Sequence, residues 1–312
     1  MTKKISIITP CYNEEDALYN CTETINNLFN NELKEYDYEH IICDNNSNDR
    51  TVNILREISL NNKKIKVILN ARNYGSVRST FNGIKNSEGD AVLLFYPVDM
   101  QDPPDKIPEF VKSWREGFDF VVGCRSQREE FFFMKSIRKI FYIILKKFSK
   151  NNIPLNVSDF QLVDKKIVDK MKKLKDNFPF IRTLAFEYSD NYKTIDYTWK
   201  KRKIGKSKEH LKDYISSAMK GLISVSDTPF RIILYAGIFV SILSIFYGFF
   251  SLFYNIFFQN DLDKGMPTLL ISILIFSGLQ LLVLGFIGEY ISSIHNQLKK
   301  DIEVNEKEKI NF

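Results

Sequence analysis

Apolar positions fall into short runs that alternate with stretches of helical pattern over residues 1–130. The runs are largely uncharged and bounded by polar residues, as expected of strands buried in a parallel sheet. They lie at 4–9, 38–43, 65–69, 91–96 and 118–124, and one intervening helix is predicted at 76–86. Strands that alternate with helices predict βαβ units, and therefore an α/β fold in which helices cover a mostly parallel sheet.

A cluster of polar residues follows each of the first three predicted strands. The clusters are PCYNEE at 10–15, DNNSND at 44–49 and NARNYG at 70–75. Asn13 has the side chain of a helix cap and is followed by acids, so turns and caps are one explanation of these clusters. Because the carboxyl ends of parallel strands meet at one edge, the clusters also predict one nucleotide-sized crevice, in which Arg72 would meet phosphate.

The strand predicted at 91–96 leads into PVDMQDPP at 97–104. Asp99, Gln101 and Asp102 would lie at the carboxyl edge of a central strand, and hard oxygen ligands at that edge suit Mg²⁺ or Mn²⁺. A solvated acidic turn stopped by prolines is the alternative. The chain has no Gly-x-Gly-x-x-Gly and no complete P-loop signature, so dinucleotide and P-loop sites lack their motifs.

Two basic segments indicate contact with an anionic surface. Residues 131–150 combine aromatic side chains with lysines and arginines in a helical pattern, which is typical of a helix lying on a membrane. The basic loop KKRKIGKSK at 200–208 suits phosphate or anionic lipid headgroups. An ordinary core helix and a solvated loop are the alternatives. The chain has 44 Lys and Arg against 38 Asp and Glu, an excess that does not by itself indicate nucleic acid, and none is expected as a partner.

Two long apolar segments, at about 230–258 and 267–290, predict a pair of membrane-spanning helices. Basic residues lie outside the pair, at 200–208 and 299–300, whereas the connection 259–266 is short. The positive-inside rule then places both chain ends in the cytoplasm, and a buried soluble hairpin is the alternative. The cysteines show no CxxC spacing, as expected of a reduced cytoplasmic domain, and the three histidines have no zinc-ligand spacing.

Taken in order, the motifs resemble those of inverting glycosyltransferases with a GT-A-type nucleotide-sugar domain. The resemblance is to the branch that acts on polyprenyl phosphates, related to dolichol-phosphate mannose synthase and bactoprenol glucosyltransferases. The segments that carry it are TPCYNEE at 9–15, DNNSNDRT at 44–51, RNYG at 72–75, PVDMQDPP at 97–104, SDFQL at 158–162, RKIGKSK at 202–208 and LLVLGFIGEY at 281–290. They are similar to PxYNEE, DDGSTDGT, RNxG, DADLQDPP, GDFRL, RxxGxSK and LLxLGxxGEY, so the resemblance spans essentially the whole chain.

The resemblance implies a Rossmann-like GT-A domain followed by a two-helix transmembrane hairpin. It implies inverting transfer of a sugar from a nucleotide diphosphate donor, expected to be a UDP-sugar, to polyprenyl (undecaprenyl) phosphate. The reaction would use Mg²⁺ or Mn²⁺ at the cytoplasmic face of the inner membrane and would serve cell-surface glycan modification. The chain would divide into a donor part at 1–130, an acceptor part with basic interfacial helices at 131–226, the hairpin within 227–298 and a cytoplasmic polar tail at 299–312.

The resemblance also assigns roles to individual residues by motif position. Asp99 and Gln101 would hold the metal, and Asp159 would act with Asp99 in catalysis. The donor nucleotide would be bound by Pro10, Tyr12, Glu14, Asp44, Asn45 and Arg72. The acceptor phosphate would be bound by Arg125, Arg202 and Lys208.

Two departures from the family pattern leave alternatives open. Asn45 stands where relatives have an acid, and Pro97 replaces the first Asp of the DAD triplet, which removes one possible metal ligand. A catalytically weakened paralogue that acts as a membrane scaffold is therefore the alternative function. A processive polysaccharide synthase is disfavoured, because the chain lacks Gln-x-x-Arg-Trp and has only two predicted spans. These motifs determine neither the sugar nor whether the protein is a homo-oligomer.

Overall fold

The computed structural model describes residues 2–128, 153–154, 156–174, 180–199, 266–298 and 304–312, with single residues between 237 and 253. The chain forms two compact units, one made of residues 1–213 with 300–312 and the other of residues 214–299. The predicted basic helix at 131–150 and the basic loop at 200–208, with Arg202 and Lys208, lie outside the described residues.

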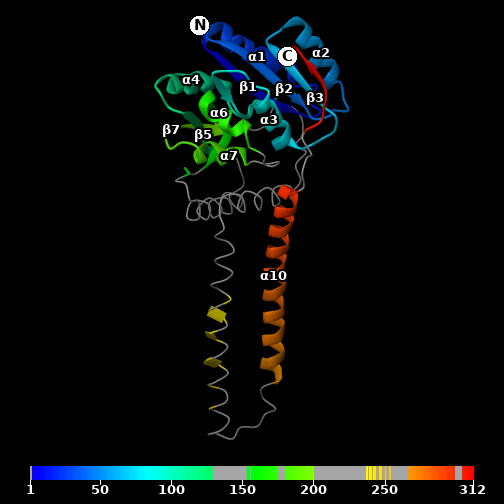
Figure 1. Cartoon of the computed structure of the whole chain (residues 1–312), viewed down its shortest axis with the longest axis vertical. Coiled ribbons are helices and arrows are strands. Elements are labelled where there is room, and N and C mark those ends of the chain that lie inside the picture. Colours follow the sequence, from blue (N-terminus) through cyan, green and yellow to red (C-terminus); the bar gives the residue numbers. More distant parts are fainter. Residues whose placement is uncertain are drawn as a thin grey trace. The chain divides into compact units, whose positions relative to one another are not determined.

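A sheet of eight strands forms the centre of the first unit as described, in the order β7-β5-β6-β4-β1-β2-β3-β8. The strands are β1 (Lys4–Cys11), β2 (Asp37–Asp44), β3 (Ile65–Asn70), β4 (Ala91–Leu93), β5 (Phe120–Arg128), β6 (Val157–Asp164), β7 (Tyr192–Trp199) and β8 (Glu306–Ile310). β1 to β4 run parallel to one another and β5 is parallel to β7, whereas β6 and β8 are antiparallel to their neighbours. The predicted α/β class with a mostly parallel sheet is confirmed (Figure 1). Each strand predicted within 1–130 is present.

Helices cover both faces of this sheet. They are α1 (Leu18–Asn31), α2 (Thr51–Asn61), α3 (Ser76–Lys85), α4 (Ile107–Arg115), α6 (Lys165–Lys172) and α7 (Ile181–Leu184), with short 3₁₀ turns η1 (Pro104–Lys106) and η2 (Ala185–Glu187). α1 packs against α2, and α3 packs against α6. The helix predicted at 76–86 is α3, and it begins after Gly75, whose φ of 85° is a conformation that glycine adopts without strain.

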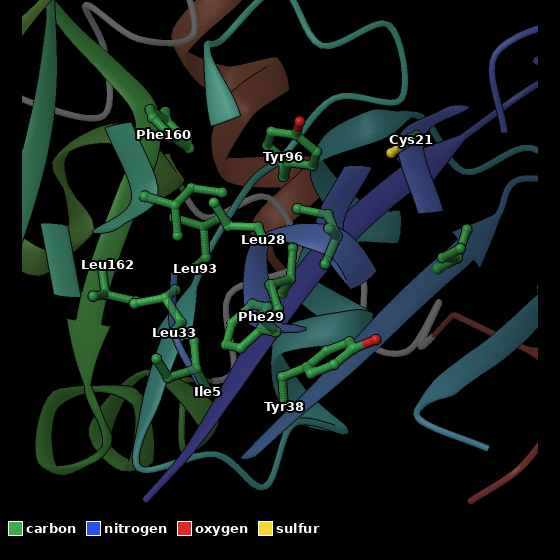
Figure 2. Close-up of a cluster of buried hydrophobic side chains, with 14 of the residues drawn as sticks. Ile5, Cys21, Leu28, Phe29, Leu33, Tyr38, Leu93, Tyr96, Phe160 and Leu162 are labelled. Atoms are coloured by element: carbon green, nitrogen blue, oxygen red, sulfur yellow. The ribbon is translucent and has the colours of Figure 1, made fainter. Parts of the chain in front are cut away.

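The core follows from the alternation of side chains along each strand. Ile5 and Ile7 belong to the buried cluster that also contains residues of α1, α2 and α4. Ile8 points to the opposite face, where a Cβ on Gly83 of α3 would lie only 2.6 Å from the Ile8 Cγ2 atom. Glycine at this position therefore lets α3 lie directly on the sheet. Figure 2 shows part of the first cluster, including Ile5, Leu28, Phe29, Leu93 and Phe160.

The structure does not support the alternative explanation in which Asn13 caps the first helix. α1 begins at Leu18 after Ala17, with no side-chain cap and no acid in its first turn. Asn13 instead has a positive φ of 52°, and its Oδ1 atom accepts a hydrogen bond from the backbone N–H of Asn48. The side chain that could have capped a helix thus joins two loops.

The predicted polar tail at 299–312 also needs correction, because residues 306–310 form the edge strand β8. It pairs with β3, with Ile310 opposite Val67, and Ile310 packs against the main buried cluster. The sequence EKEKI alternates between partly buried and exposed positions along the strand. The sequence did not indicate a strand here, because glutamate and lysine are uncommon in strands other than at sheet edges.

The second unit contains α10 (Met266–Leu298), which spans the second of the two predicted apolar segments. The first segment, 230–258, lies almost entirely outside the described residues. In the part of the chain that the structure describes, no helix has the length and apolar composition needed to cross a membrane.

Candidate active site

The strand order brings the predicted site residues to one edge of the sheet. The carboxyl ends of β1, β2, β3 and β4 lie together because these strands are parallel. β6 is antiparallel to β4, so its amino end lies at the same edge. Asp159, near the start of β6, therefore comes to the edge where the polar clusters follow β1 to β4.

The loops after β1 and β2 are joined by hydrogen bonds. The Asn13 N–H donates to the Ser47 hydroxyl at 2.8 Å, and the Asn48 N–H donates to Asn13 Oδ1 at 2.7 Å. The Glu14 N–H donates to the Thr51 hydroxyl at 2.9 Å. Glu14 is thereby held beside the start of α2, and the two predicted nucleotide-binding motifs form one connected surface.

Asp44 lies at the base of this surface, with only 1% of the residue exposed. Its Oδ1 atom accepts a hydrogen bond from the Ser47 hydroxyl at 2.5 Å, and its Oδ2 atom accepts one from the Ser47 N–H at 3.1 Å. Burial raises the pKa of Asp44, although the bonds from Ser47 act in the opposite direction. Pro10 lies within β1 opposite Cys43, and Tyr12 directly follows the end of β1, where Cys11 is opposite Asp44.

Asn45 holds the loop that follows β3. Its Oδ1 atom accepts a hydrogen bond from the Tyr74 N–H at 2.9 Å, and its Nδ2 atom donates to Asn73 Oδ1 at 2.8 Å. An aspartate could not make the second bond, because an ionised carboxylate has no proton to donate. The exposed Arg72 guanidinium lies over the Tyr74 ring, 4.7 Å from its centroid. The departure at Asn45 is thus matched to an amide network that shapes the loop carrying Arg72.

The stretch after β4 offers few metal ligands. Asp99 Oδ1 accepts a hydrogen bond from the Gln101 N–H at 3.2 Å, around Met100 with a φ of 50°. Among the described residues, no group of three or more His, Cys, Asp and Glu side chains is placed to hold a metal ion. One carboxylate and one amide oxygen fit an ion that is carried mainly by a substrate diphosphate and water, as Mg²⁺ usually is.

Asp102, the third polar residue of that stretch, is fully buried in an ion pair. Arg125 Nη2 donates to the two Asp102 oxygens at 3.1 and 3.3 Å, and the Tyr197 hydroxyl donates to Asp102 Oδ1 at 2.5 Å. Burial acts to lower the pKa of Arg125, but the Asp102 charge outweighs it and raises the pKa. Arg125 also lies over the Trp199 ring at 5.2 Å. Asp102 thus neutralises the Arg125 guanidinium, and the binding of the acceptor phosphate by Arg125 stays a prediction.

Asp159 is paired with Arg182, which the sequence did not single out. The guanidinium donates to both carboxylate oxygens, and the partners are each about one quarter exposed. Burial acts to raise the pKa of Asp159, but the charge and hydrogen bonds of Arg182 outweigh it and hold the pKa below its ordinary value. Gln161, also on β6, donates through Nε2 to the Arg182 carbonyl at 2.7 Å and so fixes the start of α7.

Comparison with known proteins places this site in a family. Residues 6–172 match the profile of the family described as Glycosyl transferase family 2, and this match covers more than half of the chain. The chain belongs to glycosyl transferase family 2. The resemblance found in the motifs is therefore confirmed, and the protein is a glycosyltransferase with a GT-A-type domain.

Relatives of this family 2 glycosyltransferase match along almost its whole length. The uncharacterized glycosyltransferase YkcC of Bacillus subtilis (strain 168) is 34% identical over 295 residues, which are 94% of this chain and 90% of the relative. The bactoprenol glucosyl transferase of Shigella phage SfV is 32% identical over 310 residues, 98% of this chain and 100% of the relative.

Solved structures share the fold. Glucosyl-3-phosphoglycerate synthase from Mycobacterium tuberculosis, in complex with Mn²⁺, uridine diphosphate and glucosyl-3-phosphoglycerate, has a TM-score of 0.51 and 16% identity. The match covers 71% of this chain and 78% of that chain. The family 2 fold explains why polar side chains gather at the carboxyl edge of the sheet, since open α/β sheets bind ligands there.

Proposed function

We propose that this glycosyltransferase transfers a sugar from a UDP-sugar to polyprenyl phosphate, with inversion, at the cytoplasmic face of the membrane. The observation that carries the proposal is the similarity to the bactoprenol glucosyl transferase of Shigella phage SfV, which covers 98% of this chain and 100% of the relative. The similarity thus includes the apolar C-terminal segments as well as the sheet. The product would serve modification of cell-surface glycans.

Donor binding would fall to the loops at the carboxyl edge. In this proposal Pro10, Tyr12, Glu14 and Asp44 bind the nucleoside, and Arg72 binds the diphosphate. The buried Asp44 carboxylate suits a hydrogen bond from a base or ribose, because charge-assisted bonds are strong where water is excluded. The exposed Arg72 guanidinium suits bidentate contact with phosphate oxygens.

Asp159 would lie at the reaction centre. A polyprenyl phosphate is already anionic near neutral pH, so the acceptor needs little help from a general base. Arg182 keeps Asp159 ionised, and a fixed carboxylate stabilises positive charge that develops at the anomeric carbon as the donor bond breaks. Arg125, Arg202 and Lys208 are proposed to bind the acceptor phosphate.

Asp99 and Gln101 would hold a divalent cation, Mg²⁺ or Mn²⁺, together with the donor diphosphate. When bound, the cation neutralises charge on the departing nucleotide diphosphate. The Mn²⁺ in the complex of the Mycobacterium tuberculosis synthase supports this choice. Asp99 orients the ligand set through its bond to the Gln101 N–H, and a water molecule would supply the oxygen ligand that Pro97 cannot provide.

The membrane part of the proposal rests on sequence. The segments 230–258 and 267–290 are proposed to form a hairpin, because each is long enough to span a bilayer and the second carries a single charged residue near its end. The basic residues outside the pair would keep both chain ends cytoplasmic. This arrangement would hold the site beside the lipid phosphate.

The test uses membranes that contain the full-length protein, incubated with undecaprenyl phosphate and a panel of radiolabelled UDP-sugars. We expect label in the organic extract, released by mild acid as a single sugar, and roughly 100-fold less transfer by membranes that contain the Asp159→Asn variant. Label found only in long water-soluble polymer would overturn the acceptor assignment. If the parent neither binds nor transfers any UDP-sugar, the scaffold function suggested by Pro97 becomes the better explanation.

A further inference from the structure

Residues 304–312, here called the C-terminal segment, reach the donor edge of the sheet. β8 in this segment extends the sheet beyond β3, and Figure 1 shows the red strand alongside β3. Beyond the end of β3, the Ala71 N–H donates to the Asn305 carbonyl at 2.8 Å. The C-terminal segment therefore continues past the sheet and contacts residues 71–75, here called the Arg72 loop.

A second hydrogen bond joins the segment to the Arg72 loop. The Asn305 N–H donates to the Tyr74 hydroxyl at 3.2 Å. The backbone of Tyr74 is held at its other end, because its N–H donates to Asn45 Oδ1 at 2.9 Å. The ring is thus fixed at both ends, and it is the surface on which the Arg72 guanidinium rests, 4.7 Å from the centroid.

The C-terminal segment is itself well anchored to the first unit. Glu306 Oε1 accepts a hydrogen bond at 2.9 Å from the side chain of Asn82, which lies in α3, and one at 3.2 Å from the side chain of Asn86, which directly follows α3. At the other end, Asn311 Nδ2 donates to the Ser59 and Ile65 carbonyls at 2.7 and 2.9 Å. Because both ends of β8 are fixed, Asn305 is presented to the loop in a defined position.

We propose that the C-terminal segment is a positioning element of the donor site, which orders the Arg72 loop before the donor arrives. This inference rests on the proposed function, in which Arg72 meets the donor diphosphate. An exposed arginine that must be ordered on binding loses part of its affinity to conformational entropy. Asn305 and Tyr74 reduce that loss because the loop is already in its bound shape.

Covering an open sheet edge is a simpler role for β8. That role predicts effects on stability and aggregation, and it predicts no selective change in affinity for the donor. The positioning role predicts a higher KM for the donor with an unchanged kcat at saturating donor. The two roles are therefore separated by kinetics on the full-length protein.

The decisive variants are Asn305→Pro, which removes the N–H donor, and Tyr74→Phe, which removes the hydroxyl acceptor and keeps the ring. We expect each to raise the KM for the UDP-sugar and the Kd for UDP about fivefold, as loss of one hydrogen bond implies, with kcat within about twofold. Because both variants break the same hydrogen bond, the double variant should bind UDP no more weakly than either single variant. Asn305→Ala keeps both backbone groups and should bind UDP like the parent.

A second control lies on the same strand. Glu308 pairs with Arg56 away from the Arg72 loop, so Glu308→Gln should leave the KM for the donor unchanged. The inference is overturned if Asn305→Pro and Tyr74→Phe leave both constants within about twofold of the parent. It is also overturned if Asn305→Ala weakens UDP binding as much as Asn305→Pro, since the backbone contact would then be irrelevant.

Hydrogen exchange gives a measurement that needs no donor. In a variant that ends at residue 303, we expect amide exchange at residues 71–75 to be faster than in the parent, with exchange in β1 unchanged. Equal exchange at 71–75 would overturn the inference. If the parent binds no UDP, the proposed function fails, and exchange still decides whether the segment orders the loop.

Discussion

Arg182 donates two hydrogen bonds to the Asp159 carboxylate, from Nη2 to Oδ2 at 2.7 Å and from Nε to Oδ1 at 3.3 Å. The two residues come from different elements, α7 and β6, and the Arg182 carbonyl is fixed by Gln161. Bidentate pairing fixes the direction of the carboxylate as well as its charge. This pair makes Asp159 a defined, ionised group at the site.

The first prediction concerns the pH dependence of transfer. The pKa of Asp159 lies below its ordinary value of 3.8, so its ionised form is complete above that pH. Its stabilising effect on the fold is lost only as pH falls through the lowered pKa. Arg182→Ala removes the main cause that lowers the pKa of Asp159, so burial would be opposed mainly by the smaller effect of the Arg125 charge and the pKa should rise. We expect the acid limb of the kcat profile to move to higher pH.

The matched control is Arg115→Ala, which removes a surface cation paired with Glu35 and should leave the profile unchanged. Arg182→Lys should recover part of the parent profile, because it restores the charge without the bidentate geometry. An acid limb in Arg182→Ala identical to that of the parent would contradict the assignment.

The second prediction tests the role of Asp159 itself. Asp159→Asn keeps the size of the side chain and removes its charge, so kcat should fall roughly 100-fold while the KM for the donor changes little. Steady-state kinetics on the detergent-solubilised full chain would check this. A rise in KM with unchanged kcat would instead place Asp159 in ground-state binding.

The third prediction concerns stability. Asp102→Ala leaves the Arg125 guanidinium buried without its counter-ion, so the free energy of unfolding should fall by about 3 kcal/mol or more. Denaturant unfolding of the full chain would measure it. Lys106→Ala breaks an exposed pair with Glu109 in the next turn and should cost less than about 1 kcal/mol. Equal effects of the two variants would show that the buried pair contributes little.

The fourth prediction tests the metal. Asp99→Asn should abolish metal-dependent transfer, and a chelator should do the same to the parent until Mg²⁺ or Mn²⁺ is restored. Asp105→Asn, which changes an exposed acid in the same stretch, should behave like the parent. Pro97→Ala should be tolerated, because Pro97 lies beyond the end of β4 and supplies no ligand. Unchanged metal dependence in Asp99→Asn would exclude Asp99 as a ligand.

The fifth prediction concerns topology. A reporter that is active only outside the cytoplasm should give signal when inserted at Asp263, and none at Lys212 or after Phe312. The reporter is placed after Phe312 and not within β8, because an insertion within β8 would break the edge strand. Signal from the reporter at Lys212 or after Phe312 would contradict the hairpin.

The sequence predicted those parts of the fold that leave a local signal. Strands β1 to β5 each contain a short apolar run, and the parallel arrangement of β1 to β4 brought their polar clusters to one edge as expected. Arg182 could not be found in this way, because it lies in a stretch without a motif and meets Asp159 only when α7 packs on β6. A pairing of this kind depends on the order of strands in the sheet, which hydrophobic periodicity does not encode.

Two other features escaped for related reasons. The nucleotide contact of Asn45 stays a prediction from its motif, whereas its hydrogen bonds to Asn73 and Tyr74 were not predicted, because these residues follow a different strand. β8 pairs with β3 across more than two hundred residues of sequence, and its alternating charges resemble those of a solvated tail. In each case the deciding contact is long-range.

The placement of β8 makes residues 214–299 an insertion within the first unit, because the chain leaves that unit and then returns to complete its sheet. During synthesis, the edge of β3 stays open until everything through residue 298 has been translated. Closing so long a loop costs chain entropy and slows folding. β8 can therefore pair with β3 only after the apolar segments have been synthesised. A molecule in which the edge of β3 is still unpaired has not completed its sheet.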